Sequence, residues 1–126
     1  MNRSAVLSVA TITCLGVLGC SQVKPDPLTM DDLYQALESR GVKVENRKAQ
    51  ITKFIKAESG EAFDANGTAC EVYIWDLSTK DGTSGYENTQ EYGFYGGETV
   101  MTKNMGVTCK GETAEGKTVL AIAKEL

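Results

Sequence analysis

The hydrophobic positions that follow residue 27 repeat first with the period of a helix. Four apolar side chains stand at i, i+3, i+4 and i+7: Met30, Leu33, Tyr34 and Leu37. This spacing places them along one face of a helix. Thr29 precedes the run as a suitable N-cap, Asp32 stands where a capping box has its acid, and Gly41 is a suitable C′ residue. The pattern predicts an amphipathic helix over residues 30–40.

Beyond this helix the pattern changes to that of strands and turns. β-branched and aromatic residues over 51–57 and 70–77 predict two strands. The segment 59–67 between them, which ends in Asn66-Gly67, predicts the turn of an antiparallel hairpin. A turn over 111–116 separates the last of three further predicted strands, which are 98–103, 107–110 and 117–123.

Residues 78–97 allow two interpretations of their structure. They are rich in Gly, Ser, Thr and Asn and then in aromatic residues, which favours either a short helix over 86–92 capped by Ser84 or a long loop. Tyrosines and glycines suit a recognition surface. The candidate binding surface consists of Tyr86, Tyr92, Phe94 and Tyr95. In the alternative interpretation these rings cover one end of the sheet.

The order of these elements predicts an α+β fold. We expect one N-terminal amphipathic helix packed on an antiparallel sheet of four or five strands. Residues 28–126 are enough for a single small domain with one core.

The first twenty residues have the pattern of an export signal. Arg3 precedes an uncharged apolar run over 5–18, which is too short to cross a bilayer permanently. The segment Leu15-Gly16-Val17-Leu18-Gly19-Cys20 resembles the lipobox of bacterial lipoprotein precursors, although Leu18 is larger than the residue usual there. The alternative is an ordinary cleaved signal and a free periplasmic protein.

The lipobox resemblance implies an address for the mature protein. Residues 1–19 would be the signal peptide, Cys20 would carry the lipid, and residues 20–27 would form a short tether to the membrane. A residue other than Asp after the cysteine, here Ser21, implies the outer membrane and its periplasmic face.

The four cysteines then divide into three roles. Cys14 leaves with the signal and Cys20 takes the lipid, so that Cys70 and Cys109 remain. An exported pair of thiols in an oxidising compartment is expected to form a disulfide. The alternative is a metal site, which the absence of histidine disfavours.

The charge of the chain is unevenly distributed. Without Arg3, the mature chain carries 12 basic and 17 acidic side chains, a net charge of −5. A basic stretch over 40–56 forms a candidate basic face: Arg40, Lys43, Arg47, Lys48, Lys53 and Lys56. It suits anionic lipid head groups or an acidic envelope polymer, or else is a solvated strand face. The net negative charge and the export signal argue against a nucleic-acid partner.

The sequence offers little for catalysis or cofactor binding. Histidine, the commonest general base and metal ligand, is absent, and no nucleophile elbow or phosphate loop occurs. Asp64-Ala65-Asn66-Gly67 lacks the carboxylates that a calcium loop needs at its two ends. We therefore expect no enzyme activity, no metal and no cofactor.

These observations favour a non-catalytic envelope lipoprotein that binds another envelope protein or polymer through residues 83–97 or the basic stretch. One alternative is a periplasmic enzyme inhibitor. Ser84-Gly85-Tyr86 resembles a loop of membrane-bound lysozyme inhibitors, although the Trp that follows in that family is absent. A third hypothesis is a small-ligand carrier or sensor, which needs a concave apolar pocket.

Overall fold

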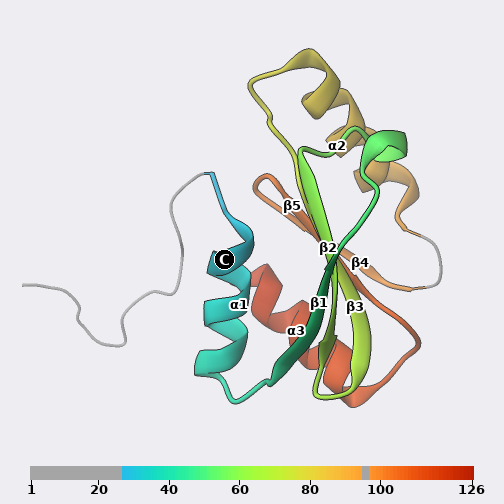
Figure 1. Ribbon diagram of the computed structural model, residues 1–126. Helices are drawn as coiled ribbons and strands as arrows, with labels where there is room; N and C mark the ends of the chain where they lie inside the picture. The colour runs from blue at the N-terminus through green and yellow to red at the C-terminus, as the bar shows by residue number, and fades with distance from the viewer. Residues whose placement is uncertain (1–26, 95–96) are drawn as a thin grey trace, which may run out of the picture.

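The computed structural model describes residues 27–94 and 97–126, and it has an α+β fold (Figure 1). Five antiparallel strands form one sheet in the order β1-β2-β3-β5-β4. The strands are β1 (Val44–Ala49), β2 (Ser59–Ala65), β3 (Thr68–Ile74), β4 (Thr99–Thr102) and β5 (Met105–Cys109). The described helices are α1 (Met30–Ser39), α2 (Lys80–Tyr92), α3 (Ala114–Lys124) and the 3-10 turn η1 (Lys53–Ile55). The predicted signal peptide, Cys20 and Tyr95 lie outside the described residues.

The main core lies between one face of the sheet and the helices α1 and α3, which both lie on that face (Figure 1). Leu33 and Leu37 of α1 are fully buried there, together with Val72 of β3 and Val107 of β5. The helix α1 begins where the sequence predicts it. The Thr29 hydroxyl accepts a hydrogen bond from the Asp32 N–H, and the Asp32 carboxylate accepts one from the Thr29 N–H.

The predicted disulfide is confirmed, and its cysteines are neighbours across the sheet. Cys70 of β3 stands directly opposite Cys109 of β5, and the two are bonded. The next pair, Ala69 and Lys110, shares a backbone hydrogen bond of 2.8 Å. The cysteines therefore occupy a non-hydrogen-bonded pair, where side chains of antiparallel strands come closest.

The first hairpin turns at Asn66-Gly67, as their sequence favours, but its first strand differs from the predicted one. Asn66 and Gly67 both have positive φ, 48° and 89°, as a tight two-residue hairpin turn requires. The prediction of a strand over 51–57 and a turn over 59–67 is wrong, because β2 itself is Ser59–Ala65. Glycine is a weak strand former, but Gly60 is the residue that fits at this position of β2. A Cβ there would overlap the ring of Tyr73 on the neighbouring strand.

Two further helices replace a predicted strand and an undecided segment, so the expectation of one helix is wrong. Residues 117–123, predicted as a strand, lie within α3. The Thr113 hydroxyl caps this helix by accepting a hydrogen bond from the Gly116 N–H. Its buried residues recur at helical spacing, Gly116, Val119, Leu120 and Ala123. Within 78–97 the structure has α2, which is longer than the predicted short helix and is capped by Thr79 instead of Ser84.

Candidate functional site

The aromatic residues of the predicted binding surface are divided between packing and exposure. Tyr86 meets the ring of Trp75 edge-on at 5.5 Å, and Phe94 stacks on Tyr73 at 5.1 Å. Tyr73 and Trp75 are buried, yet they lie outside the core formed with α1 and α3. Tyr86 and Phe94 therefore cover the other face of the sheet. Tyr92 is 74% exposed.

The basic stretch does not form one face of the molecule. Four of its cations stand within 4.0 Å of an acid, in the pairs Arg40–Glu125, Lys43–Glu45, Arg47–Glu61 and Lys56–Asp81. Lys53 belongs to η1. Arg47 points toward α1, with its guanidinium 4.2 Å from the centroid of the Tyr34 ring. Lys48, the next residue, lines a small hollow with Ala62 and Thr108 on the opposite side of the sheet.

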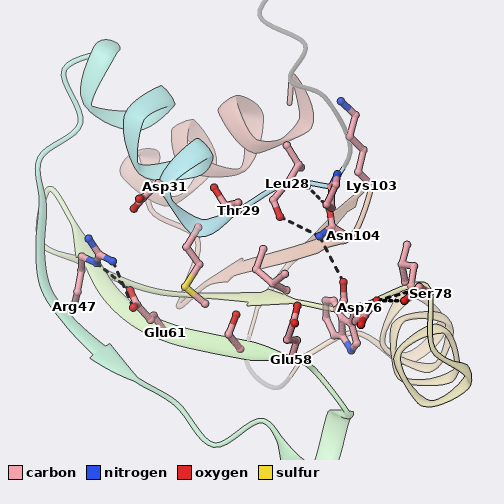
Figure 2. Close-up of a pocket in the computed structure, with 16 residues that line it drawn as sticks. Leu28, Thr29, Asp31, Arg47, Glu58, Glu61, Asp76, Ser78, Lys103 and Asn104 are labelled. Atoms are coloured by element: carbon pink, nitrogen blue, oxygen red, sulfur yellow. Dashed lines mark hydrogen bonds and ion pairs between the residues drawn. The ribbon is translucent and has the colours of Figure 1, made fainter.

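An open cleft of about 880 Å³ lies beside the N-terminal end of α1, and we call it the α1 cleft (Figure 2). Its walls come from segments far apart in the sequence: Pro27–Asp31, Arg47, the beginning of β2, Ile74–Ser78 and the turn Lys103–Asn104. Leu28, Met30 and Ile74 are among its apolar lining residues. Figure 2 shows the Arg47–Glu61 pair at one end of the cleft and Asp76 with Ser78 at the other.

Asn104 fixes the wall of the α1 cleft that leads into α1. Its Oδ1 accepts a hydrogen bond of 2.7 Å from the Leu28 N–H, and its Nδ2 donates one of 3.0 Å to the Leu28 carbonyl. A longer contact of 3.5 Å joins Nδ2 to the Trp75 carbonyl. Asn104 and Leu28 are both buried, so these bonds satisfy backbone groups that water reaches poorly.

A bulge in β1 places Arg47 at one end of the cleft. The pairing with β2 shifts between Glu45 and Lys48, and Asn46 has a left-handed φ of 55°. One extra residue reverses which side of a strand the next side chain occupies. Arg47 consequently faces Glu61 of β2, with its Nε 2.9 Å from Oε1.

The same carboxylate ties α1 to the sheet. The Tyr34 hydroxyl donates a hydrogen bond of 2.8 Å to Glu61. The hydrogen bond from Arg47, followed by the one from Tyr34, holds the pKa of Glu61 below its ordinary value against the effect of burial. Burial and the Glu61 carboxylate raise the pKa of Tyr34 well above its ordinary value.

At the other end of the cleft a short turn orients Asp76. Its Oδ1 accepts hydrogen bonds from the Ser78 hydroxyl at 2.6 Å and from the Ser78 N–H at 3.0 Å. These two bonds, the hydroxyl first, lower the pKa of Asp76. Asp31 and Glu58 bring two more carboxylates to the lining. The cleft thus combines apolar walls with charged ends, which suits the binding of an amphipathic ligand.

Sequence reasoning missed the α1 cleft and the residues that shape it. Asn104 carried a weak signal, because it lies between two predicted strands, where a turn is expected. Glu61 fell inside a segment interpreted as a turn. No local pattern brings residues 28, 59 and 76 together, because residue 59 lies near residue 76 through the pairing of β2 with β3, and Leu28 is held there by Asn104.

Comparison with protein-family models, curated proteins and solved structures found no match to this chain. Within residues 27–94 and 97–126, no helix is long and apolar enough to span a membrane. In the same residues, no three His, Cys, Asp or Glu side chains gather where they could hold a metal ion.

Proposed function

We propose that the protein is a non-catalytic, lipid-anchored protein of a bacterial cell envelope that holds part of another envelope protein or polymer in the α1 cleft. The observation that carries this proposal is the cleft itself. Its volume of about 880 Å³ falls in the range typical of ligand sites, roughly 300–1,000 Å³. Apolar side chains line it together with a few oriented polar groups, of which Asp76 and Glu61 are the best fixed.

The chemistry of the cleft supports binding over catalysis. The chain has no histidine. A general acid or base works best with a pKa near the operating pH. The pKa values of Glu61 and Asp76 are both lowered, so these carboxylates remain ionised near neutral pH and are weak bases. They are suited to fixing a donor group of a ligand.

The lipobox resemblance at residues 15–20 supports the anchor. Cys20 precedes Leu28 by eight residues, which span at most about 29 Å when fully extended. A lipid on Cys20 would therefore keep the α1 cleft close to the membrane, and Ser21 favours the periplasmic face of the outer membrane.

The size of the cleft also favours a second candidate, a carrier or sensor of a small amphipathic ligand. The inhibitor hypothesis gains no comparable support. Ser84, Gly85 and Tyr86 lie inside α2, where Gly85 is buried against η1 and the half-buried Tyr86 packs edge-on against Trp75, so they do not form a protruding loop.

A matched pair of substitutions tests the binding proposal. Ser59 is exposed, lines the cleft and faces the same side of the sheet as Ile74, so Ser59→Arg places a long side chain in the cleft. Ser39→Arg makes the same change at the exposed C-terminal end of α1. Each variant is purified from solubilised envelopes under gentle conditions, and the components that remain bound are weighed by native mass spectrometry.

We expect wild type and Ser39→Arg to retain the same bound component. Ser59→Arg should retain at least about tenfold less of this component than wild type does. The mass of that component separates the two candidates, since a carrier retains a small molecule. Equal retention by all three proteins would contradict binding in the cleft. Intact mass of the N-terminus tests the anchor separately, because lipidation adds acyl chains to Cys20.

A further inference from the structure

Large apolar side chains are exposed at the end of the sheet that carries the α1 cleft. Among the described residues, Phe54 is 88% exposed, Ile51 76% and Leu77 43%. Ile51 and Phe54 belong to residues 50–57, which we call the η1 segment. Leu77 follows β3 and lines the cleft. A single exposed apolar residue is ordinary, but Ile51 and Phe54 stand three positions apart in one segment, and neighbouring exposed apolar residues indicate an interaction surface.

The η1 segment is fixed to the sheet at both ends and at its centre. The Gln50 N–H donates a hydrogen bond of 2.9 Å to the Gly60 carbonyl, and the Glu58 N–H donates one of 2.7 Å to the Ile74 carbonyl. The indole Nε1 of Trp75, which is buried, donates to the Ile55 carbonyl at 2.8 Å. The fold therefore fixes the backbone at Ile55, while Phe54 is presented to solvent.

Helix α2 supports the same segment from behind. Gly85 lies so close to η1 that a Cβ at this position would overlap the Ile55 carbonyl oxygen. The Ile55 carbonyl is thus held by Trp75 on one side and by α2 on the other. This packing fixes the backbone next to Phe54 and keeps Phe54 exposed. Little conformational entropy is then lost when Phe54 enters a new environment.

The charges around Phe54 are all of one sign within the segment. Residues 50–57 contain two cations, Lys53 and Lys56, and no acid. Lys53 and Lys56 flank Phe54. Lys56 stands 4.0 Å from Asp81, and both side chains are exposed, so this pair is weak. An aromatic side chain between lysines suits the boundary between anionic head groups and acyl chains.

The first described residues lie at the same end of the sheet as the η1 segment. Pro27 and Leu28 line the α1 cleft together with Glu58, the residue that directly follows the η1 segment. Figure 1 shows the beginning of the described chain and η1 at the same end of the sheet. Pro27 follows Cys20 by seven positions, a reach of at most about 25 Å.

We propose that the η1 segment is a second membrane contact, in which Phe54 and Ile51 enter the surface of an anionic phospholipid bilayer and Lys53 and Lys56 pair with its phosphates. The argument from chain length rests on the proposed anchor at Cys20, whereas exposure, rigidity and charge do not. The contact fixes the orientation of the protein and holds the cleft end against the bilayer.

The test places a fluorescent reporter at the contact. The lipidated protein carrying Phe54→Trp is reconstituted in vesicles of phosphatidylethanolamine and phosphatidylglycerol with brominated acyl chains. Wild type supplies the background of Trp75, which is buried. Tyr92→Trp is the matched control, because Tyr92 is a similarly exposed aromatic residue at the C-terminal end of α2.

We expect the emission that Phe54→Trp adds to the Trp75 background to shift to shorter wavelength and to lose intensity in brominated vesicles. The emission that Tyr92→Trp adds should keep its wavelength and its intensity. Adding Lys53→Glu to Phe54→Trp should reduce the quenching. Emission from position 54 that is unshifted and unquenched would overturn the proposal and would leave the patch to a protein partner.

The anchor and the contact fail in different ways. If intact mass shows no lipid on Cys20, the proposed anchor is wrong. The contact is then judged by the same Phe54→Trp reading on the unlipidated protein at high lipid concentration. Quenching supports the second contact in that case, and its absence overturns it.

Discussion

Replacing Asn104 by alanine should destabilise the protein and loosen the entrance to α1. The substitution removes two hydrogen bonds to Leu28, of 2.7 and 3.0 Å, and the longer contact with the Trp75 carbonyl. Two such bonds contribute about 1 kcal/mol each, and a buried backbone group left without a partner costs about 1–3 kcal/mol. Since Leu28 is only 1% exposed, we expect a loss of about 3 kcal/mol in the free energy of unfolding.

Two measurements check this value. Chemical denaturation gives the free energy of unfolding, and a loss of this size should lower the Tm by about 15 °C in a domain of this length. Hydrogen exchange should show faster exchange of the Leu28 amide, because its acceptor has been removed. Asn88→Ala on the exposed part of α2 is the matched control and should change stability by less than about 0.7 kcal/mol.

The outcome bears on the architecture of the cleft. If Asn104→Ala and Asn88→Ala are equally stable and the Leu28 amide is equally protected in both, Asn104 does not hold the wall, and the account of the α1 cleft is mistaken. Asn104→Asp refines the result. It retains an oxygen for the Leu28 N–H but puts a charge opposite the Leu28 carbonyl, so it too should destabilise.

Three further changes test other contacts. Cys70→Ser opens a disulfide of sequence separation 39, which should cost about 4 kcal/mol and lower the Tm by roughly 15–20 °C in thermal unfolding; oxidised and reduced wild type of equal stability would argue against this. Glu61→Gln should lower the free energy of unfolding by about 1 kcal/mol at neutral pH and by less at low pH. A carboxylate whose pKa is lowered in the folded state stabilises the fold above its unfolded pKa near 4.5, and this effect is lost as the pH falls through its folded pKa. A difference in stability between the variant and wild type that is the same at every pH would refute the ion pair. Gly85→Ala should cost about 2 kcal/mol despite its better helix propensity, because the new methyl group meets the Ile55 carbonyl, whereas the exposed Ser84→Ala on the same helix should be neutral by the same assay.

The parts of the fold that could be predicted from the sequence are those with local causes. The helix α1 follows from an apolar stripe and a capping box whose members are at most a turn apart. The tight turn follows from the positive φ that Asn66 and Gly67 accept. The disulfide follows from the two cysteines that remain once the predicted signal peptide and Cys20 are set aside.

The elements that the sequence predicts wrongly depend on contacts with residues distant in the chain. The strand β2 contains Ser59, Gly60 and Glu61, which are poor strand formers, and it exists because β1 and β3 pair with it on both sides. Conversely, the apolar residues around Phe54 look like a strand, but Trp75 and α2 hold them in a 3-10 turn. In α3 the β-branched residues obscured a helical spacing that the sequence does contain.

Less of the candidate site than of the fold could be predicted from the sequence. Composition alone leaves open whether Tyr86 and Phe94 form a binding surface or cover the sheet, and the structure shows them packed on Trp75 and Tyr73. The α1 cleft needs Leu28 and Asn104, 76 positions apart, to meet. Such a meeting follows from the order of the strands, which no local pattern in the chain reveals.

Photo-crosslinking in living cells tests the central claim most directly. A photoreactive amino acid replaces Ser59 in the cleft or, as the control, Ser39 at the end of α1, and adducts are identified by mass spectrometry after illumination. We expect one envelope component to be joined to position 59 and not to position 39. The same adducts at both positions, or none at position 59, would contradict a ligand in the α1 cleft.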